Sequence, residues 1–397
     1  MIQRAMYLEQ LIRFRDKRLI KVVTGIRRCG KSTLLDLYKD ELQKSGVYPE
    51  QVIALNFEDV EFEGFLDRKA LYSHITSRLS PDRMNYIFLD EIQHVNEWQR
   101  VVDSLFIKKN CDVYITGSNA HLLSGELATL LSGRFVEIKM LPLSFQEYKS
   151  AFPESNDIPH LYRTYLVNSS FPYTLDLDEP KDIRAYLEGI YTSVLLKDVV
   201  IRKKIADATA LESIVRFMAD NIGNLCSAKK IADTMTSNGR KISVHTVESY
   251  LAALCDSFFL YKAGRYDIKG KQYLKIGEKY YLVDIGLRYH LLGAHKADMG
   301  RALENVVYLE LLRRGYRVYI GKIGASEVDF IATGESGPEY YQVALTVRDE
   351  QTLARELKPL RSVADHNPKY LLTLDEDPVA SHNGIKQINA LDWLLGG

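Results

Sequence analysis

The stretch "TGIRRCGKSTLL" places glycines, a lysine and a serine at a spacing suited to holding phosphate. Gly25, Gly30, Lys31 and Ser32 satisfy the pattern G-x-x-x-x-G-K-[ST] directly after an apolar run. Glycines let backbone N–H groups approach phosphate oxygens, and a following helix adds a favourable dipole. Lys31 is expected to reach the β- and γ-phosphates, and the Ser32 hydroxyl to bind Mg²⁺. The predicted loop comprises Gly25, Ile26, Arg27, Arg28, Cys29, Gly30, Lys31, Ser32 and Thr33.

Two acids in "YIFLDEIQ" supply the groups that hydrolysis needs. An apolar run places Asp90 at the carboxyl end of a buried strand, where open α/β sheets bind ligands. We expect Asp90 to complete the Mg²⁺ shell with Ser32, and Glu91 to polarise the attacking water as a general base. The alternative is that both acids merely end a strand in water.

Three further polar residues are candidates for catalysis. The strand "VYITGSNA" ends in Ser118 and Asn119, which can sense a γ-phosphate and orient water, or can form an ordinary turn. Arg134, in "LLSGRF", comes directly before the next apolar strand. An arginine there can act in trans on a nucleotide bound by a neighbouring subunit of a ring, and a solvated arginine is the alternative.

Length and composition indicate which class of protein this chain belongs to. A length of 397 residues suggests about two to four domains. The 52 basic and 52 acidic residues cancel, so only local clustering can indicate nucleic acid. The charged N-terminus and the absence of an apolar run of about 18 residues argue against a signal peptide or membrane span. Four scattered cysteines fit reduced thiols, and we expect a cytoplasmic protein.

The elements around the loop and the acids predict an α/β fold. Runs of β-branched and aromatic residues alternate with helical stretches, which is typical of interior strands in a parallel sheet. The predicted helix after the loop covers 31–46. The predicted strands cover 19–25, 51–59, 85–93 and 111–120, and the segment 135–148 closes the unit.

We predict four consecutive parts. A P-loop domain with a parallel sheet occupies 1–150, and a helical connecting or lid region follows at 151–207. Segment 208–292 has the order of a winged helix-turn-helix: three helices, two of them capped by serines, and then a hairpin. A second α/β domain covers 293–397.

The winged-helix segment is a candidate DNA-binding module. Its third helix, which begins near 244, would enter a major groove with its N-terminal residues. The segment 262–279 holds six Lys or Arg residues against two acids, an excess that suits a phosphate backbone. Glu248 on the reading helix favours the alternative, a protein-packing module with solvated lysines. The predicted DNA contacts are Ser243, His245, Thr246, Lys269 and Lys271.

The C-terminal domain resembles the restriction-endonuclease-like core. Glu304 on a helix, Asp329 in "EVDFIA" and Gln342 in "YYQVAL" occupy the order of its metal-binding positions. The lysine that this resemblance implies is Ala344 here, and alanine can neither donate to phosphate nor steer water. Lys322 on a neighbouring strand is a possible substitute. We expect a vestigial site in a domain retained for binding DNA or partners.

The chain as a whole resembles the prokaryotic AAA-type ATPases whose C-terminal half is a domain of unknown function. The matching segments include "GIRRCGKST", "IFLDEIQ", "ITGSNAHLLS", "LSGRF", "LPLSFQEY", "LLKDVV" and "LENVVYLELLRRGY". Where that family usually has GGFP, this chain has "SSFP" at 169–172. The resemblance implies ATP hydrolysis and says little about what hydrolysis drives.

Taken together, these features predict an ATPase that remodels or translocates on DNA, including branched or repair structures. ATP and Mg²⁺ are the expected ligands, and DNA and further copies of the chain the expected partners, as a dimer or a ring such as a hexamer. One alternative is a nucleotide-dependent switch in defence or toxin control, and another is an ATP-dependent nuclease. No membrane partner is expected.

Overall fold

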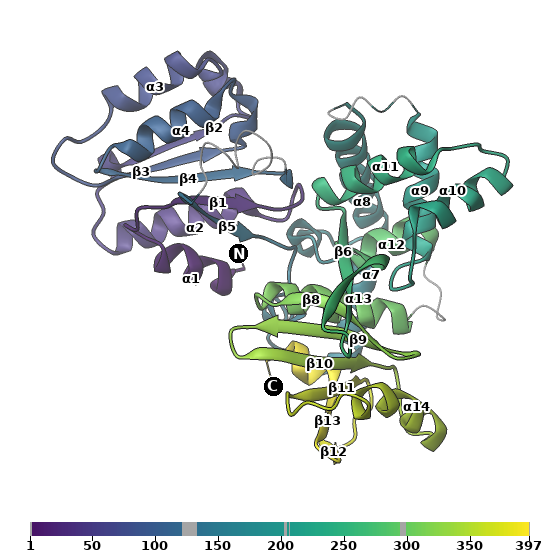
Figure 1. The fold of residues 1–397 in the computed structure, drawn as a ribbon. Coiled ribbons are helices and arrows are strands. Elements are labelled where there is room, and N and C mark those ends of the chain that lie inside the picture. Colours follow the sequence, from purple (N-terminus) through teal and green to yellow (C-terminus); the bar gives the residue numbers. More distant parts are fainter. Residues whose placement is uncertain (1, 121–132, 202–204, 206, 294–298, 397) are drawn as a thin grey trace. The chain divides into compact units, whose positions relative to one another are not determined.

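The computed structural model describes residues 2–120, 133–201, 205, 207–293 and 299–396 (Figure 1). The chain divides into two compact units, which are described separately below. The first unit comprises 1–140 with 256–258, and the second comprises 141–255 with 259–397.

The first unit is built on a five-stranded sheet of order β2-β3-β4-β1-β5. All four neighbouring pairs are parallel, which confirms the predicted α/β parallel fold. Both β1 and β3 are buried along their whole length, as their apolar sequences require. The strands are β1 (Ile20–Thr24), β2 (Val52–Asn56), β3 (Asn85–Asp90), β4 (Cys111–Gly117) and β5 (Phe135–Lys139).

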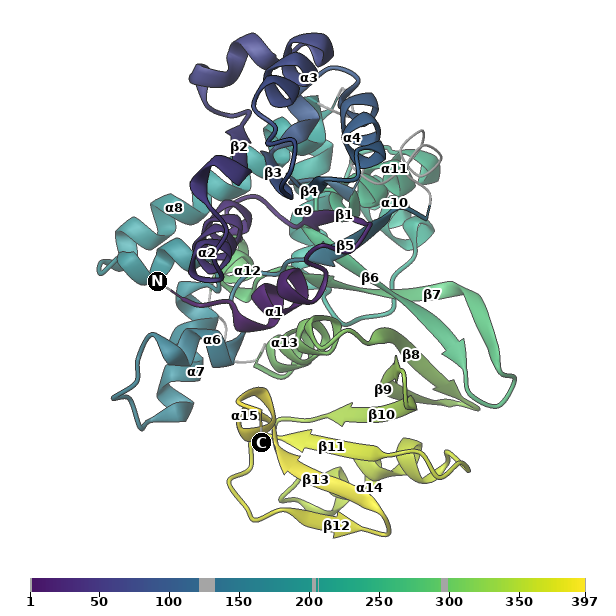
Figure 2. The same cartoon turned by 90° about the vertical axis from the view of Figure 1, so that its left-hand side faces the viewer.

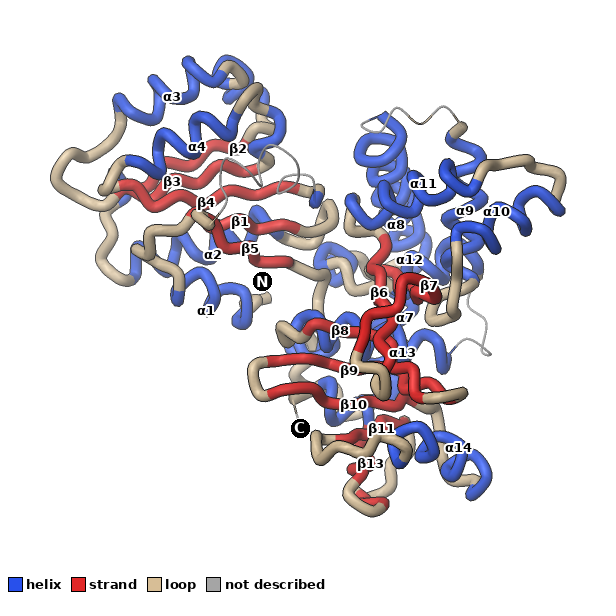
Figure 3. Tube along the Cα trace, viewed as in Figure 1, coloured by secondary structure: helices blue, strands red, loops and turns tan. Residues whose placement is uncertain are grey.

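Helices cover both faces of this sheet. Figure 3 shows α1 and α2 on one face and α3 and α4 on the other. The face under α3 and α4 is a core of aliphatic side chains drawn from strands and helices, including Val22, Leu89, Leu105 and Ile115. The helices are α1 (Ala5–Arg13), α2 (Lys31–Lys44), α3 (Arg68–Ser77) and α4 (Trp98–Ile107), with short 3₁₀ turns at Pro49–Gln51, Val60–Phe65 and Ile92–His94.

A buried ion pair joins β1 to its neighbour β4, the central strand of the sheet. Lys21 on β1 is fully buried, and its ammonium pairs with the Asp112 carboxylate on β4 and donates to the Lys17 carbonyl at 3.0 Å. The Tyr114 hydroxyl donates to the same carboxylate at 2.7 Å. Burial lowers the pKa of Lys21 and raises that of Asp112, so each group depends on its partner to stay charged.

The second unit begins with helices. After α6 (Phe145–Ser150), α7 (Ile158–Asn168) and a 3₁₀ turn (Pro172–Asp176), α8 (Pro180–Ser193) continues as a π-helix at Val194–Ile201. At the starts of the next helices, the two predicted caps Ser227 and Ser243 accept the backbone N–H groups of Lys230 and Thr246, and Asp207 caps a third helix. These helices are α9 (Ala208–Asp220), α10 (Ala228–Ser237), α11 (Val244–Asp256) and α12 (Ile285–Leu292).

An eight-stranded sheet of order β12-β13-β11-β10-β9-β8-β6-β7 completes the second unit (Figure 2). Its strands are β6 (Leu260–Asp267), β7 (Gln272–Leu282), β8 (Arg317–Ile323), β9 (Ser326–Gly334), β10 (Gly337–Val343), β11 (Lys369–Thr373), β12 (Ala380–His382) and β13 (Ile385–Asn389). The β6–β7 hairpin, which we placed in the winged-helix segment, pairs through β6 with β8 and so extends this sheet.

Two helices pack on opposite faces of the eight-stranded sheet. Phe330 on β9 packs against Tyr308 of α13 (Met299–Arg313), and its neighbour Ile331 packs in a core with Leu357 of α14 (Glu350–Arg361). A short helix, α15 (Ala390–Leu394), follows the last strand. Within the described part of the chain, no helix is long and apolar enough to cross a membrane.

Candidate active site

The carboxyl ends of β1, β4 and β3 bring the predicted loop and acids together. Thr116 on β4 lies beside Val23 of β1, and the preceding residue, Ile115, lies beside Leu89 of β3. The loop after β1, the acids at the end of β3 and Ser118 after β4 therefore share one edge of the sheet. Ligands of open α/β sheets bind at this edge.

The loop itself depends on two glycines with left-handed backbone. Gly25 has φ 157°, and a Cβ there would lie 2.2 Å from the Met140 carbonyl oxygen. Gly30 has φ 100° and forms the N-cap of α2. A residue with a side chain would clash at the first position and be strained at the second. The glycines are thus required by the path of the backbone around Lys31.

Lys31 is the buried cation of the site. Its ammonium donates to the loop carbonyls of Gly25 and Ile26 at 3.2 and 3.4 Å, and pairs with Glu91 at 3.3 Å. Burial alone would lower the pKa of Lys31, but Glu91 and Asp90 outweigh it and the pKa is raised. The side chain therefore carries a fixed positive charge between the loop and the acids.

One hydroxyl from β4 holds both acids. The Thr116 hydroxyl donates to the Asp90 carboxylate and accepts the Glu91 backbone N–H at 2.9 Å. Asp90 also hydrogen-bonds Ser32, the other predicted metal ligand. Burial raises the pKa of Asp90 in spite of these two hydrogen bonds. The predicted metal pair is thus adjacent, with its carboxylate oriented by a neighbouring strand.

Glu91 adopts a strained conformation. Its φ of 51° is uncommon for a residue with a side chain, and such strain is often found at functional sites. The Gln93 amide donates to its carboxylate. Burial alone would raise the pKa of Glu91, but Lys31 and this hydrogen bond outweigh it and the pKa is lowered. Glu91 is therefore a carboxylate that can accept a hydrogen bond from water.

Ser118 and Asn119 are both buried at the same edge. The Ser118 hydroxyl has no hydrogen-bond partner among the residues that the structure describes. A buried hydroxyl without a partner is costly, and a bound ligand would remove that cost. The geometry therefore fits the predicted role of Ser118 beside a phosphate.

The variable residues of the loop differ in their surroundings. Arg27 pairs with Glu58 at 2.6 Å, and Arg28 is exposed with φ 65°. Ile26 and Cys29 are fully buried, and Thr33 is half-buried within the first turn of α2. The Cys29 carbonyl accepts a hydrogen bond at 2.9 Å from the buried Arg4, which precedes α1. The Arg27 guanidinium therefore contacts an acidic side chain, that of Glu58.

Arg134 lies at the opposite edge of the sheet. The Ile20 N–H at the start of β1 donates to the Arg134 carbonyl at 2.8 Å, one strand length, or about 15 Å, from the loop. Its guanidinium pairs with Asp103 at 2.5 Å and lies 5.7 Å from the Phe106 ring, over which Arg18 also lies. Arg134 is therefore too distant to act on a nucleotide held by its own loop.

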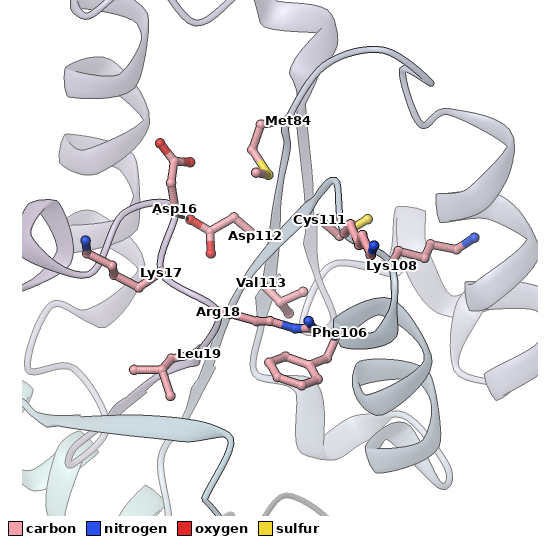
Figure 4. Close-up of a pocket in the computed structure, with 11 residues that line it drawn as sticks. Asp16, Lys17, Arg18, Leu19, Met84, Phe106, Lys108, Cys111, Asp112 and Val113 are labelled. Atoms are coloured by element: carbon pink, nitrogen blue, oxygen red, sulfur yellow. Dashed lines mark hydrogen bonds between the residues drawn. The ribbon is translucent and has the colours of Figure 1, made fainter.

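A cavity of about 260 Å³ lies at this amino edge (Figure 4). Arg18, Phe106 and the Lys21-bound Asp112 line it, together with Lys17 and Lys108. None of the predicted loop residues or acids contributes to it. The cavity is thus separate from the predicted nucleotide site.

The predicted DNA-contacting residues lie on two elements of the second unit. Ser243 and His245 are exposed at the start of α11, where the Ser243 and Thr246 hydroxyls lie 2.8 Å apart. Lys269 and Lys271 are exposed in the turn between β6 and β7. The structure therefore leaves both sets accessible to a ligand.

A buried ionic cluster contains the residues that the sequence predicts as a vestigial nuclease site. Lys279 on β7 pairs with Glu304 of α13 at 3.2 Å and with Glu327 of β9 at 2.9 Å. The Tyr281 hydroxyl donates to Glu304 at 2.8 Å. The lysine in the cluster is thus Lys279 and not Lys322, the substitute suggested by the sequence.

Asp329 and Gln342 complete this cluster. Asp329 accepts the Val343 N–H at 2.9 Å, and the Gln342 amide donates to Glu356 at 2.9 Å. Burial and the neighbouring Glu304 carboxylate raise the pKa of Asp329 to about 8. The raised pKa favours the protonated form of Asp329, which reduces its value as a metal ligand.

Sequence reasoning missed three residues of these sites. Thr116 and Arg4 gave no signal, since a threonine in a strand and an arginine before a helix are common. Lys279 was counted only in the charge of the hairpin. Lys279 lies two residues before Tyr281 and so shares the strand face that meets α13. This spacing was the signal that could have placed Lys279 beside Glu304.

Comparison with known proteins agrees with this geometry. Residues 17–149 match the family described as "AAA domain", and residues 159–298 match a domain of unknown function (DUF8612). The fold is similar to the Walker-type ATPase PABY2304 of Pyrococcus abyssi, with a TM-score of 0.52 and 16% identity over 73% of this chain and 96% of that one. The first unit is therefore an AAA-type P-loop ATPase domain.

The whole chain aligns with two relatives. An uncharacterized protein of Haemophilus influenzae is 43% identical, over 100% of this chain and 99% of its own length. The uncharacterized protein MJ1544 of Methanocaldococcus jannaschii is 30% identical, over 85% of this chain and 77% of its own. The chain belongs to the family of these two proteins.

The clash at Gly25 leads to a first prediction. Gly25→Ala should weaken ATP binding by at least about tenfold, because the loop must move to relieve strain of one to a few kcal/mol. Titration with a fluorescent ATP analogue measures the affinity. Gly64→Ala is the control, since its Cβ would meet nothing within 4 Å. Unchanged affinity in Gly25→Ala would contradict the role of this close approach.

The raised pKa of Asp329 leads to a second prediction, on stability against pH. An acid whose pKa is raised from 3.8 to about 8 by folding favours the folded state at low pH, and this stability is lost between those values. Asp329→Asn cannot ionise and should therefore gain thermal stability over the wild type as pH rises from about 5 to 9.

Thermal unfolding of both proteins across this pH range is the measurement. Asp349→Asn is the control, for which the change in thermal stability should have the opposite sign. Hydrogen bonds from Thr352 lower the pKa of Asp349, so its carboxylate stabilises the fold. A constant difference between Asp329→Asn and the wild type at all pH values would refute the assignment.

Proposed function

We propose that the protein hydrolyses ATP and uses the energy to remodel or translocate on DNA. The observation that carries the proposal is the convergence of Lys31, Asp90, Glu91 and Ser118 at one sheet edge. Lys31 neutralises phosphate charge, Glu91 accepts a hydrogen bond from the attacking water, and Ser118 donates to a phosphate or water oxygen. Burial of the acids strengthens each of these contacts.

The residues present fit a magnesium ion. Ser32 and Asp90 already contact each other and offer a hydroxyl and a carboxylate oxygen, the donors that Mg²⁺ prefers beside phosphates. When bound, Mg²⁺ neutralises charge that develops on phosphate oxygens. Thr116 keeps the Asp90 carboxylate oriented for this role.

Exposed residues of the second unit support DNA as the substrate on which the ATPase acts. Ser243 and His245 at the start of α11 suit hydrogen bonds to base edges or phosphates, as in a winged helix-turn-helix. Lys269 and Lys271 suit phosphates beside it. The order α9, α10, α11 and hairpin supports this assignment, although the hairpin also belongs to the larger sheet.

The place of Arg134 supports an active homo-oligomer. An exposed arginine at the amino edge, about 15 Å from its own loop, can stabilise a γ-phosphate only on a neighbouring copy. We therefore assign Arg134 a role in trans in a dimer or a ring such as a hexamer.

We do not propose DNA cleavage at the C-terminal cluster. The Glu304 carboxylate already pairs with Lys279 and accepts a hydrogen bond from Tyr281. The Gln342 amide already donates to Glu356. With Ala344 in the lysine position, no side chain of the predicted set remains to position water. DNA should stay intact with Mg²⁺ or Mn²⁺ during the assays below.

A third prediction tests the action on DNA. Single-stranded, duplex or branched DNA should stimulate ATP turnover, and the charge-reversed pair Lys269→Glu/Lys271→Glu should lose this stimulation and show a shallower dependence of binding on salt. Lys44→Glu, an exposed lysine on α2, is the matched control. Turnover and DNA affinity are measured over a range of salt concentrations.

Two variants separate binding from hydrolysis in this assay. Glu91→Gln should bind ATP but lower turnover by about 100-fold or more, and Lys31→Ala should lose both binding and turnover. A wild-type protein that neither binds DNA nor responds to it would exclude the proposal. Very slow turnover with tightly held nucleotide would instead favour a nucleotide-dependent switch.

A fourth prediction concerns Arg134. Arg134→Ala should bind ATP normally but turn it over slowly. Mixing it with Lys31→Ala subunits should restore turnover, because the latter supply Arg134 to an intact nucleotide site. Asp103→Asn, which alters only the partner of Arg134, should retain most turnover. Failure of the mixture to exceed the two separate variants would argue against action in trans.

A further inference from the structure

Three tyrosine rings lie together at the free end of the β6–β7 hairpin. The rings of Tyr266 and Tyr273, which are paired across the hairpin, have centroids 5.2 Å apart, and the Tyr273 ring lies 5.1 Å from that of Tyr319 on β8. The Tyr266 and Tyr319 rings are 6.4 Å apart. These separations are those of interacting aromatic pairs, so the rings form one platform, hereafter the tyrosine platform.

The tyrosine platform is the uncovered end of an apolar core. Tyr266 and Tyr319 pack against an apolar cluster that contains Val328 and Ile331. Helix α14 covers this cluster farther along the sheet. Helix α14 contacts β9, β10, β11 and β13. Figure 2 shows the hairpin at the end of the sheet remote from β12 and β13. Tyr273, at this end, is 67% exposed.

Exposed cations lie within a few residues of the platform tyrosines in the chain. Lys269 and Lys271 are exposed in the turn that leads into Tyr273, and Arg317 is exposed on β8 near Tyr319. The acid of this turn, Asp267, accepts the Gly270 N–H at 2.9 Å. The surface therefore combines aromatic faces with an excess of positive charge.

We propose that the tyrosine platform binds single-stranded nucleic acid by stacking unpaired bases on Tyr273 and its neighbours. Lys269, Lys271 and Arg317 contact the phosphates on either side. Stacking on a tyrosine ring does not depend on base identity, because each base has a π-face. It requires an unpaired base, because the bases of a duplex already stack on one another. The inference rests on the proposed action on DNA and narrows its substrate to DNA with unpaired segments.

The lysines distinguish this surface from a protein interface. Tyrosine is enriched in both kinds of interface, but lysine is depleted at protein interfaces, whereas phosphate contacts require cations. The rings are also held by strand pairing and by each other, so little ordering is needed when a base stacks.

The fifth prediction tests stacking directly. Fluorescence anisotropy compares an oligo-dT strand of about 20 nucleotides, an abasic strand of the same length and a duplex. Tyr273→Ala should weaken oligo-dT binding by about fivefold or more, and Tyr273→Phe, which keeps the ring, should bind as the wild type does. The abasic strand, which offers phosphates alone, should bind equally to all three. Tyr48→Ala, another exposed tyrosine, is the control.

Three outcomes would overturn the inference. Oligo-dT affinity in Tyr273→Ala equal to that of the wild type would exclude stacking at this ring, and equal losses on oligo-dT and the abasic strand would show phosphate contact alone. A changed oligomeric state without changed oligo-dT affinity would make the surface a contact between copies. If duplex DNA still binds and stimulates turnover, the proposed function survives; if the wild type binds no DNA, both fail.

Discussion

The proposed ATPase site depends on the insertion of β4 between β1 and β3. Thr116 on that strand donates to Asp90 and accepts the backbone N–H of Glu91, so one hydroxyl fixes the two acids against the loop that follows β1. The parallel register and the buried pair of Lys21 and Asp112 fix β4 in turn. Small errors in this register would separate the acids from Lys31, and catalysis tolerates such errors poorly.

Two of the buried lysines, Lys31 and Lys279, neutralise acids with different consequences. Lys31 begins α2 directly after the glycine-containing loop, and it shares its sheet edge with a buried hydroxyl that has no partner in the described chain. Lys279 lies within a sheet, and its acids are already satisfied by hydrogen bonds and ion pairs. The first arrangement leaves polar capacity for a ligand, whereas the second uses it internally.

The eight-stranded sheet gives the proposed DNA surface its rigidity. Because β6 pairs with β8, the hairpin that carries Lys269 and Lys271 is anchored along one side, and Tyr319 joins the two hairpin tyrosines. A hairpin attached only to helices would lack this third ring. The surface is therefore a product of the larger sheet, even though most of its residues lie in the segment assigned to a winged helix.

The sequence by itself determined the phosphate loop, the acids of β3 and the parallel sheet, because each is a local pattern of residue type and spacing. It also determined the helix starts at Ser227 and Ser243, whose side chains cap within three residues. Only the tertiary structure decided that Thr116 holds both acids, that Lys279 neutralises Glu304, and that three tyrosines from three strands meet. Contacts of this kind join residues far apart in the chain, and strand order, which no local pattern encodes, brings them together.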